Sequence, residues 1–170
     1  MKKELVLFLD FDGVLHHFFP KEDATDEENK FFYYLPYLNK FVEQIFPYYD
    51  VKIVFSTTWK ENHSICELKE NFTSYPNLFE KIIGATPNIS SETKGCKWRE
   101  AAAWMSEQGY QGEYLILDDY DIVWAEGDNE EEDEYSFLYA KDKPLNHRQV
   151  VCQNKFDDEE IKVAFKLLGL

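Results

Sequence analysis

The sequence has no excess of basic residues, and this absence limits the partners of the protein. Lys and Arg total 18 against 33 Asp and Glu, which gives a formal net charge of −15 over 170 residues. Such a charge repels polyanions at long range and argues against a general nucleic-acid-binding protein. It does not exclude a phosphorylated substrate, because a divalent cation at the site would reverse the local sign of the charge.

Long apolar segments and cysteine pairs are also missing. The apolar run near the N-terminus covers only Leu5–Leu9 before Asp10 interrupts it, which is too short for a signal peptide or a membrane span. The three cysteines lie far apart, without the spacing of metal ligands or of a disulfide framework: Cys66, Cys96 and Cys152. We therefore expect a cytoplasmic protein with buried, reduced cysteines and no contact with a membrane.

The residues that are present are those of an ordinary globular protein. Hydrophobic residues make up 44% of the chain, and the aromatic residues include 14 Phe, 11 Tyr and 4 Trp. Many of these rings must be buried, and a chain of this length is sufficient for one domain with its own core. We expect residues 1–170 to form a single domain.

Strand and helix patterns alternate along the chain. Apolar runs typical of buried strands lie at residues 5–9, 51–55, 82–85, 114–117 and 150–152. Apolar residues at helical spacing lie at 35–46, 65–72 and 98–105, and a last helix runs from a capping box of Asp157 and Glu160 to Gly169. This order predicts an α/β fold, a doubly wound and mostly parallel Rossmann-like sheet with helices on both faces.

Two further segments are predicted to be loops. Residues 16–34 combine His, Pro and acidic residues with an aromatic cluster, and we interpret them as a small flap. Residues 126–134 are strongly acidic and are predicted to form a solvated loop. The connections between the predicted elements are too short for a large cap domain, so the site is expected to be open to a bulky substrate.

Polar side chains follow three of the predicted strands, where each strand ends. These residues are Asp10 and Asp12, Ser56 and Thr57, and Asp118 and Asp119. In an open α/β sheet, ligands bind outside the carboxyl ends of the strands. The convergence of these side chains therefore predicts a functional site at that edge of the sheet.

The carboxylates at this edge indicate a metal and a phosphate. Residues two apart in an extended chain point the same way, so Asp10 and Asp12 can face one site, which Asp118 and Asp119 reach from another strand. Crowded carboxylates repel one another unless a cation lies among them, and hard oxygen ligands select Mg²⁺. A metal-bound phosphate beside a carboxylate indicates phosphoryl transfer. The alternative is that these residues only end strands as turn formers.

Four segments in this order resemble the motifs of haloacid dehalogenase (HAD) superfamily hydrolases. Asp10-Phe11-Asp12-Gly13-Val14-Leu15 resembles motif I, Ser56 motif II, Lys97 or Lys94 motif III, and Leu117-Asp118-Asp119 motif IV. At finer grain the chain is similar to the HAD domains associated with Swiss Army Knife RNA repair systems. That similarity is carried by Ser56-Thr57-Thr58-Trp59-Lys60, by Thr86-Pro87, by Lys97 seven residues before Trp104-Met105, and by Leu117-Asp118-Asp119.

The resemblance implies a role for each residue of the chemical step. Asp10 would attack phosphorus to form an aspartyl-phosphate and would also bind Mg²⁺. Asp12 would protonate the leaving oxygen and then activate water, while its backbone carbonyl binds the metal. An acid at Asp12 favours the cleavage of phosphate esters, because an alkoxide is a poor leaving group and dehalogenation needs no such acid.

The resemblance also implies how the phosphate and the metal are held. Ser56 would donate a hydrogen bond to the phosphoryl oxygens, and Lys97 would balance the charge of the nucleophile and the phosphate. Asp118 would bind Mg²⁺, with Asp119 assisting directly or through water. Thr57 is a further candidate for substrate binding through its backbone N–H, with the satisfaction of the turn as the alternative.

Several alternatives stay open at this point. The spacing to the apolar helix face favours Lys97 over Lys94 as the motif III lysine. His16 and His17 lie near the site entrance, but two histidines in a loop are more often simply exposed. Trp59 either stacks on a nucleotide or packs within the protein.

The function has alternatives as well. The first hypothesis is a phosphatase, acting on a nucleotide, on an RNA end or on another phosphorylated substrate. The charge of −15 disfavours RNA unless a partner protein supplies the contacts. The second is a HAD-like binding or regulatory module without turnover. A phosphoacceptor domain like that of response regulators ranks low, because there the aspartate follows a middle strand. Substrate and oligomeric state stay unassigned.

Overall fold

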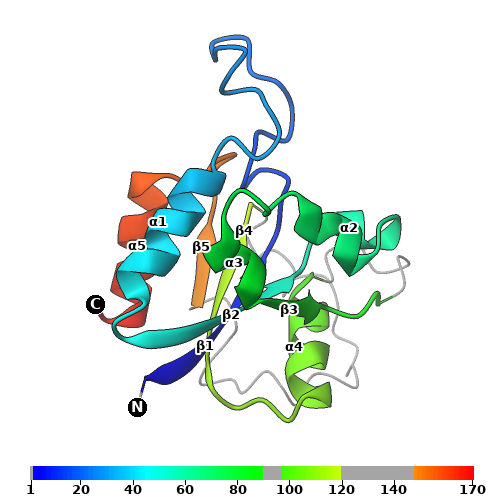
Figure 1. Cartoon of the computed structure of the whole chain (residues 1–170), viewed down its shortest axis with the longest axis vertical. Coiled ribbons are helices and arrows are strands. Elements are labelled where there is room, and N and C mark those ends of the chain that lie inside the picture. The colour runs from blue at the N-terminus through cyan, green and yellow to red at the C-terminus, as the bar shows by residue number, and fades with distance from the viewer. Residues whose placement is uncertain (1, 90–96, 120–147) are drawn as a thin grey trace, which may run out of the picture.

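Five parallel strands form the centre of the protein. The computed structural model describes residues 2–89, 97–119 and 148–170, except for the side chains of residues 97–99. The strands are β1 (Lys3–Leu9), β2 (Tyr49–Phe55), β3 (Ile82–Ala85), β4 (Glu113–Asp118) and β5 (Gln149–Val151). They lie in the order β3-β2-β1-β4-β5, and every pair is parallel (Figure 1). The predicted parallel α/β sheet is confirmed.

The central strand is buried on both faces because all of its middle residues are apolar. Residues 5–9 of β1 are at most 1% exposed. In the register of the sheet, Leu7 pairs with Ile53 of β2 on one side and with Leu115 of β4 on the other. A continuous apolar run is what a parallel strand covered on both sides requires. Successive side chains then point to opposite faces and enter two separate cores.

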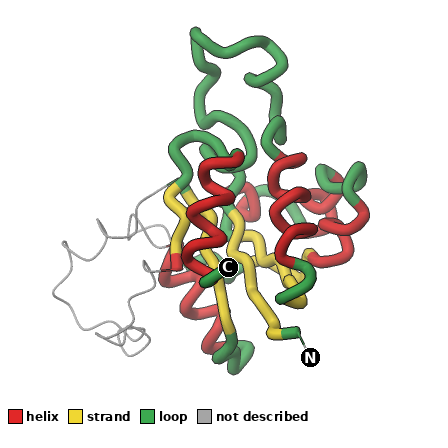
Figure 2. Tube along the Cα trace, turned by 90° about the vertical axis from the view of Figure 1, so that its left-hand side faces the viewer, coloured by secondary structure: helices red, strands yellow, loops and turns green. Residues whose placement is uncertain are grey.

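Helices cover both faces of the sheet, as predicted (Figure 2). The larger core lies under α1 (Leu35–Ile45), α2 (Ile65–Glu70), α3 (Pro76–Lys81) and α5 (Asp158–Leu168). The smaller core lies under α4 (Lys97–Glu107), where Ala101 and Ala102 pack against Val6 and Phe8 of β1. Small alanine side chains allow this helix to approach the sheet closely.

The ends of the last helix match the sequence signals. Asp157 and Glu160 form the predicted capping box. The Asp157 side chain accepts a hydrogen bond from the Glu160 backbone N–H, and the Glu160 side chain accepts one from the Asp157 backbone N–H. Gly169 ends α5 with a φ of +72°, a conformation that glycine adopts without steric cost. The helix predicted over 65–72 is shorter in the structure, where α2 ends at Glu70. A further short helix, α3, was not predicted and begins at Pro76.

Residues 10–34, between β1 and α1, form turns and no inserted domain. This segment contains the flap predicted at 16–34, which stands out beyond the carboxyl ends of the strands (Figures 1 and 2). The predicted acidic loop at 126–134 lies outside the described residues. Within the described ranges, the sheet carries no cap domain.

Two other sequence expectations concern the cysteines and the membrane. Cys152 is buried as expected, whereas Cys66 is exposed, because it lies on the outer side of the short helix α2; Cys96 is outside the described residues. None of the helices in the described part of the chain has the length and the apolar composition that crossing a bilayer requires.

Candidate functional site

The topology of the sheet creates a switch point between β1 and β4. From β1 the chain moves outward to β2 and β3, and it then returns to the other side of β1 to form β4 and β5. A crevice forms where the direction of winding reverses, and ligands bind there in open α/β sheets. The backbone N–H of Asp10 donates to the Leu117 carbonyl at 3.0 Å, so the ladder continues to this point. Asp10 therefore lies directly beside the end of β4.

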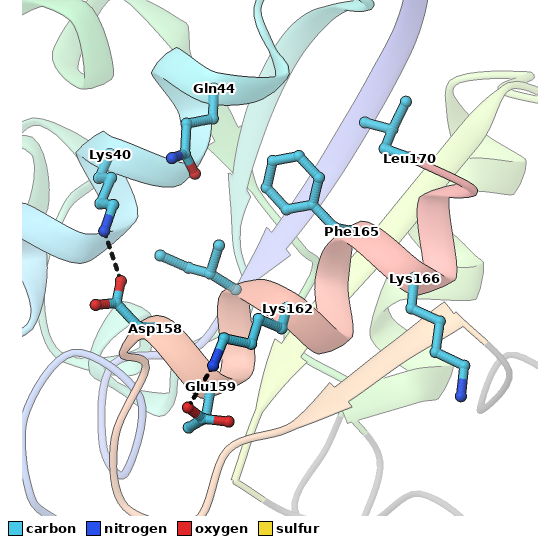
Figure 3. Close-up of a pocket in the computed structure, with 9 residues that line it drawn as sticks. Lys40, Gln44, Asp158, Glu159, Lys162, Phe165, Lys166 and Leu170 are labelled. Carbon is cyan, nitrogen blue, oxygen red and sulfur yellow. Dashed lines mark hydrogen bonds and ion pairs between the residues drawn. The ribbon is translucent and has the colours of Figure 1, made fainter.

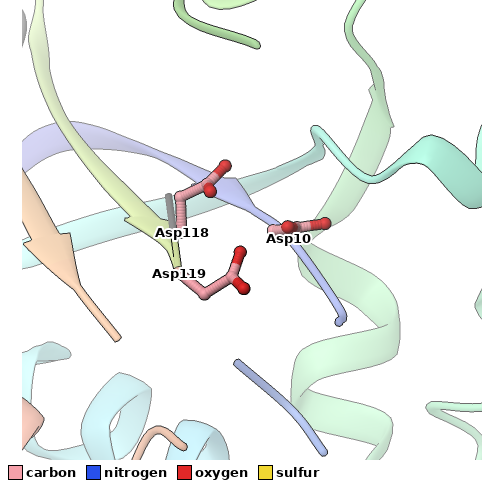
Figure 4. Close-up of side chains that lie close together, drawn as sticks. All are labelled: Asp10, Asp118 and Asp119. Atoms are coloured by element: carbon pink, nitrogen blue, oxygen red, sulfur yellow. The ribbon is translucent and has the colours of Figure 1, made fainter. Parts of the chain in front are cut away.

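Three carboxylates meet at the switch point. Asp10 and Asp118 are 1% and 2% exposed, and Asp119 is half-buried. One oxygen from each of the three lies within 4.8 Å of the others (Figure 4). One Asp10 oxygen also accepts a hydrogen bond from the Phe11 N–H at 2.8 Å, which limits the rotation of that carboxylate.

The donor set of this cluster fits a hard divalent cation. Carboxylates this close together repel one another when all of them are ionised. A cation among them removes the repulsion, and carboxylate oxygens are the ligands that Mg²⁺ takes in proteins. The cluster Asp10, Asp118 and Asp119 is therefore a candidate metal centre.

Gly13 lets the turn after β1 close over Asp119. Its φ is +69°, and a Cβ added there would lie 2.5 Å from Asp119 Oδ2 and 2.6 Å from Asp119 Cβ. Any side chain at this position would meet both backbone strain and a collision. The glycine of the motif thus lets the turn and the third carboxylate of the cluster lie in contact.

The side chain of Asp12 is not part of the carboxylate cluster. Its Oδ1 lies 3.0 Å from His16 Nε2, and its Oδ2 accepts a hydrogen bond of 2.9 Å from Trp59 Nε1. The side chain is 24% exposed, so it still faces solvent at the mouth of the site. The expected metal contact through the Asp12 backbone carbonyl stays a prediction.

Both histidines of the flap are buried, which corrects the expectation that they are exposed. His16 and His17 are 2% and 8% exposed. The His17 ring bonds the Asn154 carbonyl at 2.8 Å and lies 3.3 Å from the Tyr34 hydroxyl, and this ties the base of the flap to the segment after β5. Burial disfavours the charged imidazolium and lowers the pKa of His16. The hydrogen bond to Asp12 raises this pKa but does not offset the effect of burial. The base of the flap, at His16 and His17, is packed into the protein, and the local sequence does not show this.

Ser56 and Thr57 follow β2 beside the cluster-bearing strand. The Ser56 N–H donates to the Leu9 carbonyl at 2.8 Å, and its side chain is 2% exposed. In the described part of the chain its Oγ has no hydrogen-bond partner. Buried hydroxyls are normally paired, so this one fits a polar group of a ligand. The Thr57 hydroxyl instead accepts a hydrogen bond from the Trp59 N–H and caps the short 3₁₀ helix η1 (Thr58–Glu61).

The two candidate motif III lysines are only partly described. Lys97 is the first residue of α4, and its side chain is not among the described ones, while Lys94 lies outside the described residues. One turn into α4, the Glu100 carboxylate forms an ion pair with Lys60 of η1. Lys60 Nζ also donates to Thr86 Oγ1 at 2.9 Å. This buried cluster links the start of α4 to the segments that follow β2 and β3, and it was not predicted from the sequence.

An open groove elsewhere on the surface is separate from the carboxylates. It has a volume of about 790 Å³ and lies between α1 and α5, where Lys40 pairs with Asp158 and Lys162 pairs with Glu159 (Figure 3). None of the residues from the three strand ends lines it. Its ion pairs are exposed and contribute little to stability.

Comparison with known proteins agrees with the site. The family described as the HAD domain in Swiss Army Knife RNA repair proteins matches residues 6–150. The chain belongs to this family. The match to this HAD domain covers motif I, the strand ends and the start of β5, and it supports a hydrolase of the HAD type in general. A search of the curated proteins found no match, and neither did a search of the solved structures.

Proposed function

We propose that this HAD domain is a Mg²⁺-dependent phosphohydrolase that cleaves phosphate monoesters through an aspartyl-phosphate on Asp10. The observation that carries the proposal is the carboxylate cluster of Asp10, Asp118 and Asp119 at the switch point of the sheet. The Ser56 hydroxyl at the next strand end, which has no hydrogen-bond partner among the described residues, supports it, because a phosphoryl oxygen would accept its hydrogen bond.

The first chemical step transfers the phosphoryl group to Asp10. An oxygen of this carboxylate forms a bond to phosphorus while the bond from phosphorus to the ester oxygen breaks. Asp12 gives a proton to the departing oxygen, which leaves as an alcohol. The hydrogen bond from Phe11 N–H limits the orientations of the nucleophile before attack.

The second step hydrolyses the acyl phosphate. Asp12, now ionised, takes a proton from water, and the water oxygen attacks phosphorus to release inorganic phosphate and restore Asp10. Its 24% exposed side chain is within reach of solvent for this role. When bound by Asp10, Asp118 and Asp119, Mg²⁺ would offset the charge of carboxylate and phosphate.

The phosphate is held by groups at the other strand ends. Ser56 Oγ donates to a phosphoryl oxygen, and Thr57 contributes its backbone N–H near the start of η1. Lys97, at the first position of α4, supplies the positive charge, and the ion pair of Lys60 with Glu100 keeps that helix start in place. These charges and donors stabilise the transition state.

The substrate we propose is a phosphate on a nucleotide or on the end of an RNA in the cytoplasm. The support is the family's description, which names RNA repair proteins, together with a site that no cap domain covers in the described ranges. A net charge of −15 opposes binding of a long polyanion. Contacts to the rest of an RNA would then come from a partner protein.

Hydrolysis of 4-nitrophenyl phosphate tests the proposal. We expect turnover with Mg²⁺ that is abolished by EDTA, and a loss of at least about 10³-fold in Asp10→Asn. The exposed Asp50 on β2 provides a matched control, and Asp50→Asn should keep wild-type activity. Because 4-nitrophenolate leaves without an acid, the absence of turnover in a wild type that binds Mg²⁺ would instead support a binding or regulatory module.

A further inference from the structure

The Asp12 carboxylate is held by two N–H donors from different parts of the fold. Trp59 Nε1 donates to Oδ2 at 2.9 Å, and His16 Nε2 lies 3.0 Å from Oδ1. With the proton of a neutral His16 ring on Nε2, both contacts are hydrogen bonds that the carboxylate accepts. His16 Nδ1 is buried and has no partner in the described part of the chain, which agrees with this tautomer.

Aromatic packing fixes both donors in place. The His16 and Trp59 rings lie 5.7 Å apart, and the Phe31 ring lies 4.9 Å from the first and 5.7 Å from the second. Phe11 packs edge-on against Trp59 from the core side at 5.8 Å. A backbone bridge between Asp12 and His16 closes the turn that carries the histidine. The two donors are therefore positioned before any substrate binds.

This arrangement separates two carboxylates that the sequence places together. Asp10 and Asp12 are two residues apart, yet only Asp10 joins the cluster with Asp118 and Asp119. A carboxylate bound to a cation is held in its ionised form, so a side chain outside the cluster is better suited to exchange a proton. Each carboxylate oxygen has two lone pairs, so the bonds from His16 and Trp59 still allow a proton to be carried.

We propose that His16 and Trp59 are positioning residues that hold the Asp12 side chain outside the metal cluster, oriented to exchange a proton with the leaving oxygen. The inference rests on the proposed function, since it assigns the pair to proton transfer in that reaction. It predicts a defect that depends on the leaving group. Departure of an alkoxide needs the acid, whereas departure of 4-nitrophenolate does not.

The test compares kcat/KM for 4-nitrophenyl phosphate and for an alkyl phosphate. Trp59→Phe removes the indole N–H and keeps an aromatic ring. Trp104→Phe is the matched control, because Trp104 lies on α4 and packs on Phe8 in the smaller core, away from Asp12. We expect Trp59→Phe to lower kcat/KM for the alkyl phosphate about 10- to 100-fold. Its kcat/KM for 4-nitrophenyl phosphate should change less than about threefold. Trp104→Phe should treat both substrates alike.

His16 is tested by two substitutions. His16→Leu should reproduce the leaving-group dependence, and His16→Gln, which keeps a side-chain N–H donor, should recover part of the loss. In an Asp12→Asn background neither Trp59→Phe nor His16→Leu should lower the alkyl phosphate rate further, since both act through Asp12. Equal losses for both substrates, or additive losses in that background, would overturn the inference.

A spectroscopic measurement separates this inference from the proposed function. In ¹⁵N-labelled protein the Trp59 indole N–H resonance should move in Asp12→Asn, while the Trp104 resonance stays in place. An unmoved Trp59 resonance would show that the contact is absent and would overturn the inference even in an active enzyme. If the Trp59 resonance moves in Asp12→Asn but the wild type shows no phosphatase turnover, the contact exists and the proposed function is refuted. The proton-transfer role of the pair is then refuted with it.

Discussion

Replacing Gly13 with alanine should damage the fold and the metal centre together. An alanine at a φ of +69° costs about 1–2 kcal/mol of stability through left-handed backbone strain. Its Cβ would also lie 2.5–2.6 Å from three atoms of Asp119, one of which is the Asp119 Cβ. A new rotamer cannot move a Cβ, so the backbone must shift, at a further cost of about 1–3 kcal/mol. We expect the free energy of unfolding to fall by about 2–5 kcal/mol in total.

Gly109→Ala is the matched control for this prediction. Gly109 has a φ of +59°, and no atom of the described residues lies within 4 Å of an added Cβ. Its free energy of unfolding should therefore fall by only the strain of about 1–2 kcal/mol. The lower entropy of the unfolded chain with alanine reduces this loss further. Urea denaturation at constant m-value gives both differences.

Calorimetric Mg²⁺ titration gives the second readout of the same pair. Displacement of Asp119 should weaken Mg²⁺ binding in Gly13→Ala, while Gly109→Ala binds like the wild type. If Gly13→Ala were no less stable than Gly109→Ala and bound Mg²⁺ normally, the contact between the turn and Asp119 would be unimportant, and the reasoning would be refuted.

Three further predictions concern stability and are checked by urea denaturation. Lys60→Met should cost about 3–5 kcal/mol by leaving the buried Glu100 carboxylate without its partner, and the double variant with Glu100→Leu should recover much of that loss. Phe72→Ala should cost about 3–5 kcal/mol, whereas Phe19→Ala, at a 73% exposed side chain, should cost almost nothing; similar losses would contradict the packing described. Asp157→Ala should cost about 1 kcal/mol through loss of the α5 cap, while Asp157→Asn retains most of the capping, and a loss as large in Asp157→Asn would show that capping is not the cause.

The order of the elements was readable because its signals are local. An apolar run such as Leu5–Leu9 can be satisfied only by burial on both sides, and a capping box such as that of Asp157 acts within one turn. The placement of Asp10 and Asp118 at adjacent strand ends follows from the same pattern together with the general topology of parallel sheets.

Other features of the site could not be predicted from the sequence, because they depend on contacts between distant segments. The pair of Lys60 and Glu100 joins residues 40 positions apart, and Trp59 reaches Asp12 from the end of a different strand. Nothing in the local composition of either segment specifies the partner. The same holds for α3, a short helix whose existence depends on its packing against the sheet.

The sequence by itself therefore determined which residues arrive at the carboxyl edge of the sheet, since burial and turn chemistry act over a few residues. The tertiary structure alone decided how those residues are divided. Asp10, Asp118 and Asp119 form one cluster, whereas Asp12, two residues from the nucleophile, is drawn toward His16 and Trp59. The physical reason is that the orientation of a carboxylate is set by the donors around it, and the fold brings Trp59 of η1 beside Asp12 and His16 of the turn after β1.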